Sequence, residues 1–212
     1  MSVEPLIEQL VADAGPVRLV RPVRVRLVRW ISATLLFLVP LSLLLRTRPD
    51  LSEMLGRPAF LWSAAALALA AALAAAAALV LSVPGAERTI AQRAAPVLSA
   101  IFWPVLLLAS PAGSPDASTT PAGVCALLIA AIAAGPGWLL HRYVREGASL
   151  MPAWSAGLTV LAAGCAAALA QQLHCPSDAP AHLISEHVLA VAVLALGGAA
   201  LAAMPRRRPV YR

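Results

Sequence analysis

Residues 59–83 read AFLWSAAALALAAALAAAAALVLSV, and this stretch decides the fold class. It carries no charged side chain over its whole length. A helix needs about 20 consecutive apolar residues to cross a bilayer core of about 30 Å. The stretch is therefore predicted to be a membrane-spanning helix.

Five further apolar stretches come near the same length, and together they predict an all-α, polytopic membrane protein with six transmembrane helices. The chain is 60% hydrophobic and 12% charged, whereas a soluble domain is about half apolar and about a quarter charged. Pro104 and the run Gly135-Pro136-Gly137 predict bends in two of the helices. The five stretches cover approximately residues 30–45, 94–109, 124–140, 154–173 and 184–204.

The distribution of arginine predicts the orientation. The chain has no lysine, and arginine concentrates on one set of loops and at both ends, as expected for the cytoplasmic side. The other set of loops holds only Arg46, Arg48 and Arg57. No cleavable signal peptide is visible before the first apolar run, so that run is expected to be retained. We therefore expect a bacterial inner-membrane protein with both termini in the cytoplasm.

Three regions follow from this reading: a cytoplasmic segment over 1–29, a membrane domain over 30–204 and a basic tail over 205–212. A short amphipathic helix is expected near Pro5, with Leu6, Ile7, Leu10 and Val11 forming its apolar face. Two interpretations of that face stay open. It lies on the membrane or bundle surface, or it docks in the groove of a partner.

The residues with most chemistry lie beside the outer ends of the spans. Cys125 begins the fourth span, and Cys175 follows the fifth next to His174. A disulfide between the thiols is allowed on an oxidising face. Thiolates with imidazoles, including His187, also suit zinc, cadmium or copper(I), although no zinc-type spacing occurs. The remaining alternative is two unpaired buried thiols. Other residues on this face are Asp178, His182 and Glu186, whereas the mid-span Cys165 is expected to pack.

Several function classes find no support in the sequence. No phosphate-binding glycine loop, nucleophile elbow or pair of catalytic carboxylates is present, so we expect no enzyme. The net charge of +6 is better explained by contacts with anionic lipid than by nucleic acid, since no nucleic-acid-binding motif accompanies it.

The chain resembles the NrsF-type anti-sigma factors of Gram-negative bacteria, which are negative regulators of an extracytoplasmic-function sigma factor. The similarity covers nearly the whole length, and Cys125 together with His174-Cys175-Pro176 is its most specific part. Weaker elements occur in the same order, namely Leu6-Ile7-Glu8-Gln9-Leu10, Asp13-Ala14-Gly15-Pro16-Val17, Arg48-Pro49-Asp50-Leu51, Val83-Pro84-Gly85 and Arg145-Glu146-Gly147-Ala148.

The resemblance implies a six-span protein that holds its sigma factor inactive and senses an outside stress, a heavy-metal ion or an oxidant, through Cys125 and Cys175. Family members often carry an aromatic residue before the histidine of the sixth span, where this chain has Glu186 before His187. Two rival classes stay open. A membrane thiol oxidoreductase coupled to quinone would need closely spaced cysteines, and a small metal-ion exporter would need polar groups deep in its spans.

Overall fold

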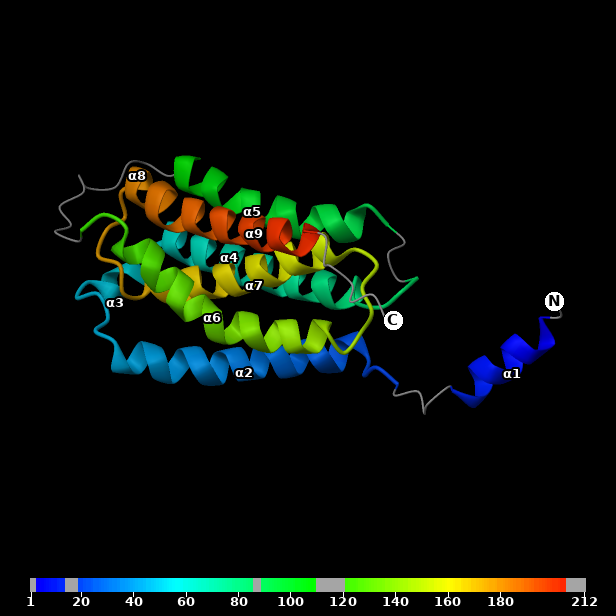
Figure 1. Cartoon of the computed structure of the whole chain (residues 1–212). Coiled ribbons are helices and arrows are strands. Elements are labelled where there is room, and N and C mark those ends of the chain that lie inside the picture. Colours follow the sequence, from blue (N-terminus) through cyan, green and yellow to red (C-terminus); the bar gives the residue numbers. More distant parts are fainter. Residues whose placement is uncertain (1–2, 14–18, 86–88, 110–120, 205–212) are drawn as a thin grey trace.

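The computed structural model describes residues 3–13, 19–85, 89–109 and 121–204, and every regular element within these ranges is helical. Six helices are long and apolar enough to cross a membrane, which confirms the predicted all-α class and number of spans. Figure 1 shows them side by side in one elongated bundle. They are α2 (Val23–Leu44), α4 (Pro58–Val80), α5 (Ala91–Ala109), α6 (Val124–Val144), α7 (Pro152–Gln172) and the run 180–203, which ends in α9 (Leu189–Ala203).

Helix α7 is the centre of the bundle and packs against α4, α6 and α9. Six of its thirteen buried residues are alanine, and small residues let helix backbones approach closely in lipid. At Gly157 a Cβ atom would lie 3.1 Å from Ala199, and at Gly198 one would lie 2.7 Å from Val160. These glycines are therefore what permits the close packing of α7 on α9.

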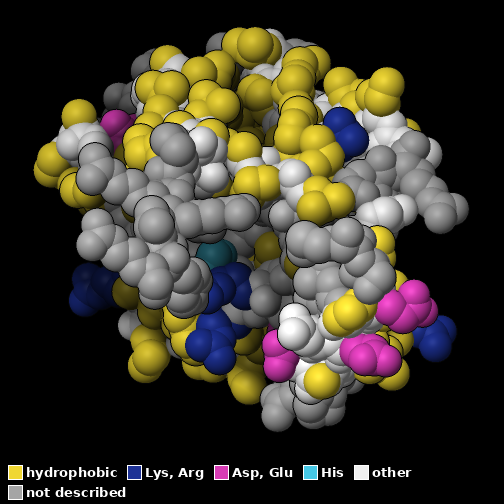
Figure 2. All heavy atoms as spheres, turned by 45° about the vertical axis from the view of Figure 1, so that its right-hand side comes forward, with side chains coloured by type: hydrophobic (Ala, Val, Ile, Leu, Met, Phe, Trp, Pro, Cys, Tyr) yellow, Lys and Arg dark blue, Asp and Glu magenta, His cyan; other side chains and the backbone are white. Residues whose placement is uncertain are grey.

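The outward side of the bundle is apolar. Figure 2 shows hydrophobic side chains over much of the described surface, with most of the visible charged side chains in the lower half of the view. Large side chains such as Leu36, Trp62 and Leu196 are exposed. A soluble monomer rarely exposes apolar surface on this scale, whereas a surface that contacts lipid requires it.

Helix α2 begins at Val23, seven residues before the apolar stretch that was predicted to start at Trp30. The difference has a physical cause in Arg26, which is buried, with 1% of its surface exposed. Its guanidinium donates hydrogen bonds to the Ser82 hydroxyl at 3.0 Å and to the carbonyl oxygens of Tyr143 at 3.0 Å and Leu79 at 3.4 Å. This end of the bundle, where α2 begins and α4 and α6 end, is called the arginine end below.

The opposite end carries Cys125 and Cys175 and is called the cysteine end. Its short elements are α3 (Leu51–Met54), α8 (Pro180–His182) and the π-helical turn η1 (Leu183–Val188), which continues directly into α9. The first lies in the connection between α2 and α4, and the other two lie between α7 and α9. The cysteines and histidines that the sequence analysis assigned to sensing lie here.

Helix α1 (Glu4–Ala12) stands away from the bundle, on the side of the arginine end (Figure 1). Ile7 and Val11 are exposed on it, by 52% and 68%. The side chains of Leu6 and Leu10 lie outside the described part of the chain, as does the basic tail over 205–212. The docking role of α1 stays a prediction.

A cluster of two thiols and two imidazoles at the cysteine end

The two cysteines predicted to act together lie side by side. Cys125 stands in the first turn of α6 and Cys175 in the loop after α7, and their Sγ atoms are 3.9 Å apart. Both are free thiols, each with only 2% of its surface exposed. The 50-residue separation in sequence is closed because α6 and α7 are packed neighbours.

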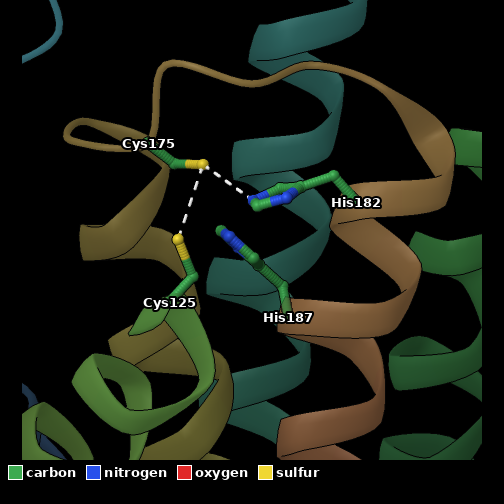
Figure 3. A group of neighbouring side chains, drawn as sticks. All are labelled: Cys125, Cys175, His182 and His187. Atoms are coloured by element: carbon green, nitrogen blue, oxygen red, sulfur yellow. Dashed lines mark hydrogen bonds between the residues drawn. The ribbon is translucent and has the colours of Figure 1, made fainter. Parts of the chain in front are cut away.

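Two histidines complete a compact cluster with the thiols (Figure 3). His182 places its Nε2 atom 3.3 Å from the Sγ of Cys175. His187 lies one turn further along, and its ring points between the two thiols and His182. One donor atom from each of the four residues lies within 4.8 Å of the corresponding atoms of the others. This set of donors is typical of sites for soft and borderline-soft metal ions.

His187 is fully buried, and neither of its ring nitrogens has a hydrogen-bond partner within the described part of the chain. A buried polar group without a partner costs about 1–3 kcal/mol. Such an arrangement calls for an explanation, and a bound ligand in the space that the ring faces is one of the standard ones.

The sequence-based site and the observed cluster differ in one histidine. His174, which was predicted beside the thiols, lies outside the cluster, with its Nδ1 atom 3.0 Å from the carbonyl oxygen of Arg46. His182 takes the corresponding place. His182 and His187 are five residues apart in sequence, a separation that does not put two side chains on one face of an α-helix. The π turn brings the two rings to the same face. Cys165 is buried in the middle of α7, as expected of a packing residue.

Glu186 holds the start of α6 in place. Its carboxylate accepts hydrogen bonds from the backbone N–H of Gly123 at 2.8 Å and of Ala126 at 3.4 Å. The negative charge thus lies at the positive end of the α6 dipole, which is a stabilising position. Gly123 has a φ of 85°, a left-handed conformation that favours glycine. Glu186 is therefore committed to capping rather than to the four-residue cluster.

A buried arginine fixes the loop that carries Cys175. Arg48 binds the carboxylates of Asp50 at 2.7 Å and of Asp178 at 2.6 Å, and its backbone N–H donates to the carbonyl oxygen of Leu173. The hydrogen bond from Arg48 holds the pKa of Asp50 below its usual value. The connection between α2 and α3 is thereby fastened to the loop between α7 and α8.

Burial controls the reactivity of the thiol in that loop. It raises the pKa of Cys175 to about 12, so the group is a neutral thiol at pH 7. The Sγ of Cys175 lies 3.7 Å from the carbonyl oxygen of Ser177. The side-chain Nε2 of Gln171 lies 3.7 Å from the Sγ of Cys125. A thiolate is the form that ligates metal and attacks oxidants, so the free thiol is expected to react slowly.

A pocket lies beside the cluster, with Cys175 in its lining. Its lining includes Arg48, Phe60, Ser63, Gln172, Cys175 and Asp178. The thiol of Cys175 is the member of the cluster that faces this pocket.

The sequence of the chain matches the model of a known protein family. The family model described as negative regulator of sigma F (NrsF) matches residues 10–207, which include every residue of the cluster. The match confirms the resemblance found in the sequence. Searches of the curated proteins and of the solved structures give no match.

Proposed function

Because the chain belongs to the NrsF family of negative regulators of sigma F, we propose that it is an anti-sigma factor of a bacterial inner membrane whose partner belongs to the extracytoplasmic-function class. Membership in the family makes the chain a negative regulator with a sigma factor as its partner. The six apolar helices make it a membrane protein. The class of sigma factor, the membrane and its orientation are parts of the proposal.

The observation that carries the proposal is that the thiol and imidazole cluster and helix α1 lie toward opposite ends of the bundle. The thiol and imidazole cluster lies at the cysteine end, and α1 lies on the side of the opposite end. We propose that the cysteine end faces the periplasm and that the arginine end, with α1, faces the cytoplasm, in accord with the arginine asymmetry. In this orientation the thiol and imidazole cluster would receive a signal from the periplasm, and α1 would bind the sigma factor in the cytoplasm.

The proposed signal is a thiol-binding metal ion or a two-electron oxidant. A metal ion would displace the protons of Cys125 and Cys175 and bind the thiolates. An oxidant would take two electrons from the pair, which would lose two protons and form a disulfide. Either event shifts the bundle between two states only if the ligand or bond favours one of them. Release of the sigma factor is the proposed consequence.

The proposed contact with the sigma factor is α1. Exposed Ile7 and Val11 stand one turn apart and therefore on one face of the helix. Leu6 and Leu10 belong to the same face by sequence spacing. An isolated helix of this length is marginal in water, so an exposed apolar face on it favours binding to a partner.

Two rival functions are supported less well. A thiol oxidoreductase coupled to quinone needs thiols that exchange readily, whereas Cys125 and Cys175 are buried. A metal-ion exporter needs polar groups along a path through the bundle, whereas α7 is lined mainly by alanine around Cys165. We therefore propose that the chain acts by binding rather than by catalysis.

Purification in mild detergent, followed by mass spectrometry of what accompanies the protein, tests the proposal. We expect one sigma factor of the extracytoplasmic-function class in the purified complex, and its release when Cd²⁺ or a thiol oxidant is added. A chain that purifies without any sigma factor, although it is folded and abundant, would refute the proposed partner.

A further inference from the structure

We infer that His182 and His187 complete a four-donor site with Cys125 and Cys175 for a single divalent ion of the Zn²⁺ or Cd²⁺ class, and that the π turn η1 creates this site. The inference rests on the proposed role of the cysteine pair in sensing and specifies its ligand. It makes two histidines, one of them absent from the sequence-based site, part of the sensor.

The spacing of the four donors fits one ion. Ligands at about 2.0–2.3 Å from a tetrahedral centre lie about 3.3–3.8 Å from one another. The two Sγ atoms are 3.9 Å apart, and the Nε2 atom of His182 is 3.3 Å from the Sγ of Cys175. No donor is more than 4.8 Å from another. Small movements of side chains therefore suffice to bring all four to bonding distance.

The π turn explains how two histidines five residues apart reach the same point. On a regular α-helix, residues at this spacing point about 140° apart around the axis. A π turn closes its hydrogen bonds between residues i and i+5 and so brings such residues to one face. The turn covers Leu183–Val188, and His182 immediately precedes it in helical conformation. The two rings meet edge to face, with centroids 5.8 Å apart.

The charges of the site also favour a divalent ion. Two thiolates and two neutral imidazoles around such an ion give a complex of zero net charge. A neutral complex is the form that a buried position beside a membrane span tolerates. The nearby carboxylates are engaged elsewhere, since Glu186 caps α6 and Asp178 binds Arg48.

Two observations point to a ligand independently of the thiols. The buried ring nitrogens of His187 are without partners and face the cluster. A pocket whose lining includes Cys175 lies beside the cluster. A thiol pair that served only to form a disulfide would need neither histidine.

Titration of the full-length, reduced protein in detergent with Cd²⁺ tests the inference, with the ultraviolet charge-transfer absorption of the Cd²⁺–thiolate bond as the readout. We expect one ion per chain. His182→Ala and His187→Ala should each weaken binding at least tenfold, and Cys125→Ser should abolish the thiolate signal of the pair. His174→Ala is the matched control, because His174 stands beside Cys175 in sequence and outside the cluster, and it should bind as the wild type does.

Deletion of Ser185 tests the π turn separately. Ser185 is exposed, and removing one residue from a π turn restores the α-helical count while leaving all four donors in the chain. The deletion sets His182 and His187 four positions apart, a spacing that shares one face of a regular α-helix. Because the π turn serves to align the two rings, we expect the deletion to bind Cd²⁺ as the wild type does. A single symmetric peak on size-exclusion chromatography and an unchanged helical circular dichroism spectrum would show that each variant is folded.

The inference is wrong if folded His182→Ala and His187→Ala proteins bind Cd²⁺ as tightly as the wild type, or if the reduced wild type binds none. Loss of binding by a folded Ser185 deletion would overturn the role of the π turn. None of these results would affect the proposed capture of the sigma factor, which is measured without metal.

Discussion

Glu186 and Gly123 join the two parts of the cysteine end, since both carboxylate oxygens of Glu186 accept the backbone N–H of Gly123, at 2.8 and 2.9 Å. Glu186 belongs to the π turn next to His187, and Gly123 precedes the helix that carries Cys125. A displacement of the histidines is therefore passed to the start of α6 through one side chain. Glu186 thus links the π turn that carries His187 to the start of α6 by hydrogen bonds.

The proposed orientation places the carboxyl terminus in the cytoplasm. A fluorescent protein fused after Arg212 should therefore be fluorescent, and alkaline phosphatase fused there should be inactive. The physical reason is the excess of arginine at both termini and at the arginine end. Fusions of alkaline phosphatase and of a fluorescent protein at the same position make a matched pair. A phosphatase-positive, non-fluorescent result would reverse the bundle and place the thiol cluster in the cytoplasm.

Replacing Ile7 and Val11 together by Asp is predicted to weaken binding of the sigma factor by about 10²–10⁴-fold. Burial of an aliphatic side chain contributes about 1.5–3 kcal/mol, and about 1.4 kcal/mol corresponds to tenfold in affinity. Binding of the purified sigma factor to the protein in detergent measures the effect. Gln9→Asp is the control, because Gln9 is exposed on the other side of α1. Equal binding by the double variant would exclude α1 as the docking helix.

Alkylation of Cys175 is predicted to be slow at pH 7 and to accelerate as the pH rises. Because burial raises the pKa of this thiol to about 12, the reactive thiolate increases about tenfold per pH unit below that value. Site-resolved mass spectrometry after timed exposure to iodoacetamide gives the rate. Complete labelling of Cys175 within seconds at neutral pH would mean that the thiol is far more accessible than its 2% exposure indicates.

Replacement of Arg48 by Gln is predicted to destabilise the bundle by about 1–2 kcal/mol at neutral pH. A charge-assisted hydrogen bond contributes about 1.5–3 kcal/mol, and the partial exposure of Asp50 and Asp178 to solvent reduces that contribution. Arg48 lowers the pKa of Asp50. Its contribution is therefore present above the unfolded pKa of about 4 and is lost as the pH falls through the folded value. Thermal unfolding in detergent at several pH values measures both effects.

The matched control for Arg48 is Arg57→Gln. Arg57 pairs with Glu53 on the surface, with both side chains more than half exposed, and such pairs contribute under about 1 kcal/mol. If the two variants unfold alike, the buried ion pairs do not fasten the cysteine end.

Gly147→Ala is predicted to destabilise the protein by about 1–3 kcal/mol, the usual cost of overpacking. A Cβ atom at Gly147 would overlap the carbonyl oxygen of Ser82, which is backbone and cannot easily move. Gly197→Ala is the control, because nothing lies within 4 Å of a Cβ atom there. Thermal unfolding of the two variants should differ by several degrees, and identical midpoints would contradict the close approach at the arginine end.

Most of the fold was predictable because membrane spans leave a strong signal in sequence. Long apolar runs without charges located all six helices, including α5 with Pro96 and Pro104 inside it. The start of α2 was wrong because Arg26 looked like part of a basic connector. Its acceptors on α4 and α6 come from residues more than 50 positions away, and no local pattern announces them.

The candidate site was predictable in its thiols and less so in its histidines. Cys125 and Cys175 were recognised because both stand at the outer ends of consecutive spans. The predicted membrane topology alone puts them on the same side of the membrane. Sequence proximity suggested His174, but the loop after α7 turns its ring to Arg46. His182 was placed on the same face as the thiols but was not assigned to the site, because its alignment with His187 depends on a π turn, which has no sequence signature.

The three hydrogen bonds of Arg26 have a mechanical consequence. They hold α2, α4 and α6 together at the arginine end, so separating these helices there would leave a guanidinium without acceptors inside an apolar layer. Arg26 is then a fulcrum, and the far end of α2 lies about 27 Å away. A shift of about 2 Å at the cysteine end tilts α2 by only about 4° at that fulcrum. A tilt of α2 that started at the cysteine end would therefore reach the arginine end as a change of angle with almost no translation.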